Sequence, residues 1–353
     1  MNRINKLQTT MSLSDIDQMI ITDYFNMLYF VNIKLHVGER LFVLLIDKIG
    51  KPKLFINELF PLADNDAYEM IRFSDNDDAI ALLASHLHGK KIGIDKSWAA
   101  GFLIRLMHFR NSDYVDGSVL IDKLRSIKDI DEQNAMIMAS RENDKIMSLI
   151  TKHFKTGISE KEIAVLLKKY FMQNNHQETS FNAIVAFGEN AADPHAVASD
   201  RKLKPQDVIL IDMGGVYQNY CSDMTRTFFW QDDSKLKDIY DIVKAANLAA
   251  ISKIKVGVAF SEIDNAAREV ITKAGYGPFF THRCGHGIGL QVHEPYDVAA
   301  SNHSLIEAGM CFSIEPGIYL PQIGGVRIED LVLVKEDKVQ VLNSFSKDRM
   351  ILR

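Results

Sequence analysis

An aspartate, Asp212, interrupts an otherwise apolar, strand-like run at residues 208–214. Burying a carboxylate without a partner costs more free energy than a fold of ordinary stability can spare. The next strand-like segment brings a second acid, Asp223. If a turn over residues 214–219 closes a hairpin in register, both carboxylates lie on one sheet face. Taken alone, these two segments favour a purely structural alternative, an ion pair between Asp223 and Arg226 at a sheet edge.

Three further segments weaken that alternative. His286 stands among the glycines of Gly285–Gly289, where the backbone can approach closely and the imidazole is the one functional group. A phosphate-binding role for this loop is disfavoured, because no Lys-Ser or Lys-Thr pair follows it. Glu315 and Glu329 each stand inside a further apolar strand-like segment. Buried acids this close would raise one another's pKa values and destabilise the fold, and two bridged divalent cations resolve that conflict.

Length and apolar content predict two domains. The chain has 353 residues, of which 47% are hydrophobic. Its first part alternates between strand-like and helix-like segments, which predicts a small sheet with helices on it. A charged stretch with Asp116-Gly117, at residues 114–128, marks the boundary, so we expect domains at 1–125 and 126–353. The expected strands are 19–22, 41–46, 53–56 and 91–94, and the expected helices are 79–88 and 99–109.

The second part is predicted to be α+β. Helix start signals stand at Asp129 with Glu132, at Ser159 with Glu162, at Ser234, and at Ser261 with Asp264. The first of these helices is expected to bury a stripe of Ile137, Met138, Ile146 and Ile150. Segments of strong β character follow at 208–213, 221–230, 311–320 and 326–334.

The charge of the chain indicates the class of binding partner, and its cysteines indicate a reducing compartment. The formal net charge is -5, and no Lys/Arg-rich block occurs, which disfavours nucleic acid or an anionic membrane and favours a small molecule or peptide. No apolar run approaches the ~20 residues needed to span a bilayer, and the opening residues are too polar for a signal peptide. We therefore expect a cytoplasmic protein. Three scattered cysteines, Cys221, Cys284 and Cys311, are expected to be reduced thiols, and Cys221 and Cys284 are expected to be packing residues.

In these settings, the order Asp, Asp, His, Glu, Glu resembles the pita-bread metallopeptidases, which include prolidase, aminopeptidase P and methionine aminopeptidase. The resemblance covers residues 129–341. The first part of the chain is similar to the smaller α/β domain that precedes the catalytic domain in prolidases and creatinase. Methionine aminopeptidases lack that domain, so they are disfavoured.

The resemblance implies a role for each acid and for His286. Asp212 would bind one divalent ion, Asp223 and Glu329 would bridge two, and His286 with Glu315 would complete the second. Manganese is favoured over cobalt, zinc or iron. A hydroxide bridging both ions would be the nucleophile, and Glu315 would accept and pass on the proton.

Three more residues match family positions. His195, in the Asn190–Ala196 segment, and His293, in His-Glu-Pro-Tyr, would donate to the substrate carbonyl and the tetrahedral intermediate. A lone histidine is usually structural, but these two contexts reverse that expectation. Arg327 would hold a ligand carboxylate, the alternative being a surface salt bridge. His282 and Glu294 are expected to support the site.

The resemblance favours hydrolysis of Xaa-Pro dipeptides by a homodimer. The main alternative is an Xaa-Pro aminopeptidase that acts on longer peptides. A creatinase-type C–N hydrolase, which needs no metal, and an inactive binding protein fit less well, because all five ligand positions are filled. One departure concerns the substrate carboxylate: Tyr296 and Asp297 stand where some prolidases carry an arginine.

Overall fold

The computed structural model describes residues 2–231 and 236–353, and it divides into two compact units, Met1–Arg125 and Ser126–Arg353. The helix start predicted at Ser234 lies outside the described residues.

Unit 1 is built on one six-stranded mixed sheet, with strand order β4-β3-β2-β1-β5-β6. The predicted α/β alternation is confirmed, although the sequence patterns missed the first two helices, β4, β6 and the last helix. The elements are α1 (Arg3–Leu13), β1 (Gln18–Ile21), α2 (Tyr24–Val31), β2 (Val43–Asp47), β3 (Lys53–Asn57), β4 (Glu69–Phe73), α3 (Ala79–Ser85), β5 (Lys91–Ile94), α4 (Ala100–Phe109), β6 (Asp113–Asp116) and α5 (Ser118–Ser126).

The described residues of unit 2 form four α-helices and several small antiparallel sheets, and the predicted α+β class is confirmed. The main sheets have the orders β12-β9-β8, β11-β10-β7 and β14-β13-β15-β18-β19, and β16 pairs with β17. The helices are α6 (Ile130–Ile150), α7 (Glu160–Gln173), α8 (Lys237–Lys253) and α9 (Phe260–Lys273), with short 3₁₀ turns at η1 (Thr151–His153), η2 (Gly188–Ala192) and η3 (Gly277–Phe279). The strands are β7 (Glu178–Thr179), β8 (Ile184–Phe187), β9 (Val208–Met213), β10 (Gly215–Tyr217), β11 (Tyr220–Cys221), β12 (Met224–Phe229), β13 (Gly285–Gly287), β14 (Glu294–Val298), β15 (Cys311–Ile314), β16 (Gly317–Leu320), β17 (Gly324–Arg327), β18 (Asp330–Val334) and β19 (Val339–Val341).

Two of the predicted helix starts are confirmed by reciprocal capping hydrogen bonds. Asp129 and Glu132 cap α6, and Ser159 caps α7 together with Glu162. The start predicted at Ser261 is wrong by two residues, because the Glu262 side chain accepts from the backbone N–H of Ala259 and α9 begins directly after it.

The predicted buried stripe of α6 is half wrong. Ile146 and Ile150 are buried, but Met138 is 37% exposed and Ile137 is only partly covered. Met136 is buried in their place, because it lies in phase with Ile146 and Ile150 on a 3.6-residue helical repeat.

Three predicted strands are each divided in two at an acid. Asp223 lies between β11 and β12, Glu315 lies between β15 and β16, and Glu329 lies between β17 and β18. Each of these carboxylates is therefore placed where the chain passes from one sheet to the next.

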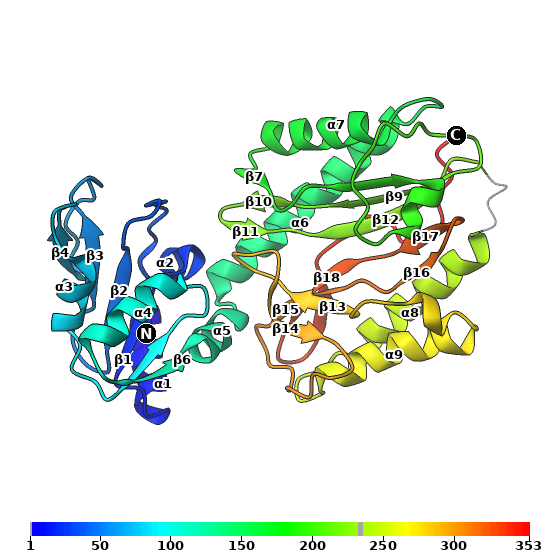
Figure 1. Ribbon diagram of the computed structural model, residues 1–353. Coiled ribbons are helices and arrows are strands. Elements are labelled where there is room, and N and C mark those ends of the chain that lie inside the picture. The colour runs from blue at the N-terminus through cyan, green and yellow to red at the C-terminus, as the bar shows by residue number, and fades with distance from the viewer. Residues whose placement is uncertain (1, 232–235) are drawn as a thin grey trace. The chain divides into compact units, whose positions relative to one another are not determined.

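The strand β9 has a core on each of its faces. In Figure 1, α6 and α7 lie on one side of β9 and β12, and α8 and α9 lie on the other. Ile209 and Ile211 pack in the cluster that includes α6 and α7, whereas Val208 and Leu210 belong to the cluster with α8 and α9. Because side chains alternate along a strand, Asp212 shares the face of Val208 and Leu210.

Candidate active site

The two aspartates are brought together by a hairpin. β12 pairs antiparallel with β9 so that Thr225 lies opposite Asp212, and Asp223 lies directly before β12. Between the two strands, β10 and β11 close a tight turn at Gln218 and Asn219, which both have positive φ as a two-residue hairpin loop of this kind requires.

The structural alternative for Asp223 is excluded by its geometry. The Arg226 guanidinium is fully buried and pairs with Asp330, its Nη2 lying 2.7 Å from the Asp330 Oδ1. It also donates to the backbone oxygen of Phe345, 2.8 Å away. Arg226 therefore ties β18 to the C-terminal segment and leaves Asp223 to other partners.

His286 occupies β13, between β14 and β15. Its backbone N–H donates to the Ser313 hydroxyl, and a Cβ on the preceding Gly285 would lie 1.9 Å from the carbonyl oxygen of Ser313, so only glycine fits there. The imidazole Nε2 lies 3.4 Å from Glu315 Oε1 and 3.7 Å from Asp223 Oδ2. The glycines thus let the imidazole reach two of the predicted acids.

Glu329, between β17 and β18, completes the group. It is fully buried, and its Oε2 accepts a hydrogen bond of 2.7 Å from the Thr225 hydroxyl. Asp223, His286 and Glu329 each offer one ligand atom, and these atoms all lie within 4.8 Å of one another.

The electrostatics of this group suit cations. Burial raises the pKa of Asp223 well above its ordinary value, and the charges of Glu329, Asp212 and Glu315 raise it further. The pKa of Glu329 is raised in the same way, by burial and then by Asp212 and Glu315. Among the described residues, Asp212 Oδ1 and Asp223 Oδ1 are buried without a hydrogen-bond partner. Unpaired carboxylate oxygens beside a buried imidazole fit divalent metal ions, which would remove the repulsion among these acids.

A buried hydrogen-bond network holds Asp212. Arg327 Nη2 donates to Asp212 Oδ2 over 2.8 Å, its Nη1 donates to the Tyr319 hydroxyl over 2.8 Å, and its Nε donates to the Thr225 hydroxyl over 3.0 Å. The Tyr319 hydroxyl also lies 2.9 Å from His282 Nε2. Arg327 is buried, which excludes the surface salt bridge considered for it. Tyr319 and Thr225 were missed by the sequence analysis, since a tyrosine or threonine in a strand is ordinary until its partners are known.

The two predicted donor histidines border this group. The His293 ring stands perpendicular to the His286 ring, with 4.3 Å between centroids, although the residue is exposed. Partial desolvation, and then the neighbouring His286, lower the pKa of His293 to about 4. His195 is exposed, and its backbone N–H donates to Asp193. The residue before His195, Pro194, accepts from Arg327 over 3.3 Å.

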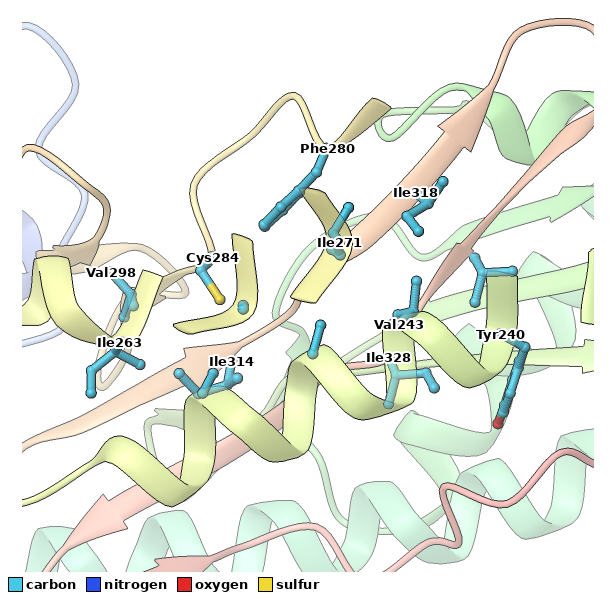
Figure 2. Packing of buried hydrophobic residues seen from close by; sticks show 14 of the residues in the cluster. Tyr240, Val243, Ile263, Ile271, Phe280, Cys284, Val298, Ile314, Ile318 and Ile328 are labelled. Carbon is cyan, nitrogen blue, oxygen red and sulfur yellow. The ribbon is translucent and has the colours of Figure 1, made fainter. Parts of the chain in front are cut away.

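The cysteines are not among these ligand candidates. All three are free thiols and buried. Figure 2 shows Cys284 in the apolar core near Val298 and Ile263. Burial raises the pKa of the Cys284 thiol well above its ordinary value, so packing is its evident role.

Comparisons with known proteins agree with this geometry. Residues 134–336 match the model of metallopeptidase family M24, and residues 3–127 match the creatinase/prolidase N-terminal domain. The chain is 36% identical over 353 residues to an uncharacterized peptidase of Staphylococcus aureus, covering 98% of this chain and all of that protein. The chain therefore belongs to metallopeptidase family M24, and its two-domain architecture is confirmed.

Solved structures extend the likeness. A dipeptidase from Pyrococcus horikoshii superposes with a TM-score of 0.94 at 35% identity, covering 99% of both chains. An Xaa-Pro dipeptidase from Bacillus anthracis does so with a TM-score of 0.90 at 31% identity, covering 99% of this chain and 98% of that one. An X-Pro aminopeptidase from Thermotoga maritima reaches 0.84 at 29% identity, covering 97% and 99%. Among the described residues, no helix is long and apolar enough to cross a membrane.

Proposed function

We propose that this protein is a dinuclear metallopeptidase that hydrolyses the Xaa-Pro bond of dipeptides. The observation that carries the proposal is the cluster of Asp223, His286 and Glu329, whose ligand atoms lie within 4.8 Å of one another. Glu315 lies beside His286, and one carboxylate oxygen each of Asp212 and Asp223 is buried without a hydrogen-bond partner among the described residues. Without a metal, burial and mutual repulsion favour the protonated forms of Asp223 and Glu329, whereas divalent cations would favour their charged forms.

Asp212, Asp223, His286, Glu315 and Glu329 would hold two divalent ions, with Asp223 and Glu329 shared between them. Oxygen-rich sites of this kind accept several metals, and we favour manganese. Ions held there would supply an acidified water as the nucleophile and would polarise the scissile carbonyl.

Glu315 is the best-placed group for moving a proton. Its side chain is 16% exposed, compared with 5% for Asp223, so it can exchange with solvent. The Ser313 hydroxyl donates to Glu315 Oε1 over 3.1 Å and fixes its orientation. His195 and His293 supply donors to the substrate carbonyl and the tetrahedral intermediate. Arg327 donates to Asp212 and so orients its carboxylate.

The second candidate is an Xaa-Pro aminopeptidase, which the likeness to the Thermotoga maritima structure favours. The dipeptidase proposal is supported by the higher similarity of the two dipeptidase structures. The test is kcat/KM for Leu-Pro against Leu-Pro-Gly under saturating Mn²⁺. We expect the dipeptide to be the better substrate. A tripeptide advantage of about tenfold, roughly 1.4 kcal/mol of transition-state binding, would assign the protein to the aminopeptidases.

We also propose a homodimer. On α4, Ile104 and Met107 lie three residues apart on one helix face and are exposed, which suits contact with a second copy. Light scattering on the purified protein tests this: a mass near 80 kDa, twice the 39.9 kDa of one chain, is expected, and a monomer at micromolar concentration would contradict it.

A further inference from the structure

A buried ion pair lies beside the candidate site without belonging to it. Lys128 Nζ lies 3.2 Å from Glu294 Oε2, and the two side chains are 1% and 2% exposed. A buried pair of this kind seldom stabilises a fold more than apolar residues of the same volume would. A contribution to stability therefore does not account for this pair, whereas its position next to His293 indicates a role in the site.

The Glu294 carboxylate organises the segment that carries His293. Glu294 Oε1 accepts from the backbone N–H of Gln291 over 3.2 Å and so closes the turn around His293. A Cβ on Gly289 would lie 2.6 Å from the same carboxylate, so the backbone passes directly over it. Residues 288–293 form neither helix nor strand. The shape of this segment thus depends on the carboxylate at its end.

Packing does not fix His293 in the way that it fixes His286. His286 is buried within β13, whereas His293 is exposed and contacts the His286 ring from outside the strand. The neighbouring residue, Glu294, is the buried anchor of this segment. A change in the orientation of the Glu294 side chain would therefore also shift the imidazole of His293.

Lys128 is itself held firmly by its backbone. Its N–H donates to the carbonyl oxygen of Gly309 over 2.9 Å, and its carbonyl oxygen accepts from Gln133 Nε2 over 2.7 Å. The preceding Ile127 forms a β-bridge with Met310. The ammonium group is thus presented to Glu294 from a backbone that is fixed on both sides.

We propose that Lys128 is a positioning residue for the reaction, acting through Glu294 to hold the His293 imidazole against the site. The inference rests on the proposed role of His293 as a donor. Lys128 lies far in sequence from the metal-ligand motifs, and in this role it affects catalysis without contacting the substrate.

The test compares Lys128→Met with Lys53→Met. Lys53 is a control for the loss of a partly buried ion pair, because its ammonium lies 3.1 Å from Asp47 Oδ2 in unit 1, whereas the candidate site lies in unit 2. Misplacing a catalytic group by about 1 Å costs about 10²-fold, so we expect Lys128→Met to lower kcat by roughly 10- to 100-fold with unchanged metal content and little change in KM. Lys53→Met should stay within about twofold of the native protein.

A double-mutant cycle separates positioning from a general structural effect. In a His293→Ala background, Lys128→Met should cause no further loss of kcat, because the group on which it acts is gone. If Lys128→Met lowers kcat by the same factor with and without His293, the proposal is wrong.

A measurement that does not depend on activity tests the role of Lys128 even if the proposed function is wrong. The ¹⁵N-imidazole NMR signal of His293, identified by its absence in His293→Ala, should shift in Lys128→Met and stay in place in Lys53→Met. An unmoved signal in Lys128→Met would overturn the inference. Glu294→Gln gives the same comparison if Lys128→Met does not fold, since it keeps the shape and removes the charge. Absence of any Xaa-Pro hydrolysis by the native protein would refute the proposed function, and the NMR comparison would still decide the role of Lys128.

Discussion

Replacing Thr225 with valine removes one buried hydroxyl and keeps the shape of the side chain. That hydroxyl donates to Glu329 Oε2 over 2.7 Å and accepts from Arg327 Nε over 3.0 Å. A hydrogen bond to a charged group is worth about 1.5 to 3 kcal/mol, and 1.4 kcal/mol is a factor of ten. If Glu329 is a metal ligand, Thr225→Val should weaken metal binding by roughly 10- to 100-fold.

Thr227→Val is the matched control for this prediction. Thr227 lies on the same face of β12 and is equally buried, but within the described part of the chain its hydroxyl bonds only the backbone of Arg327, at 3.0 and 3.2 Å. Titration of each metal-free variant with Mn²⁺ against a chelating indicator gives the affinities, and melting curves without metal show whether both lose similar stability. Equal affinities in the two variants would refute the assignment of Glu329 as a ligand supported by Thr225.

Other substitutions test other parts of the account. Asp223→Asn should abolish activity and lower the metal content per chain, because the two cations would then repel each other with one fewer anion between them. Atomic absorption and peptide hydrolysis measure both effects, and full metal occupancy with normal turnover would exclude a bridging role for Asp223. His195→Ala and His293→Ala should each keep the metal and lose kcat by roughly 10²- to 10³-fold, whereas metal loss on dialysis would make either one a ligand. His176 packs against the Phe171 ring, near Glu142, and burial lowers its pKa below the unfolded value of about 6.5. The folded protein therefore binds this proton less readily than the unfolded chain, and the free energy of unfolding should fall as the pH drops through about 6.5. His176→Leu should therefore flatten the fall of the melting temperature between about pH 7.5 and 5.5, and an unchanged slope would contradict this.

The predictions from sequence succeeded where a local pattern determines the structure. The caps of α6 and α7 are determined by residues three apart, and β9 was predicted with its observed bounds. The five candidate ligands stood out because an acid or a glycine-flanked histidine in an apolar strand is unusual. The structure places ligand atoms of Asp223, His286 and Glu329 within 4.8 Å of one another, and the ligand role of all five residues stays a prediction.

Other features depend on contacts that no local pattern reveals. The strands predicted as continuous are broken at Asp223, Glu315 and Glu329, because each acid lies where two sheets meet. The contact between Lys128 and Glu294 joins residues 166 positions apart, and a single lysine near the predicted boundary carries no local signal. Such partners become visible only once the sheets are assembled.

Titration of the metal-free protein with Mn²⁺, followed by hydrolysis of Leu-Pro, tests the central claim most directly. Activity should be negligible without metal and should rise to a plateau as the second equivalent per chain is bound, because the ligand set is proposed to hold two ions. Hydrolysis that persists in the presence of excess chelator, or no hydrolysis of Leu-Pro after two equivalents are bound, would contradict it.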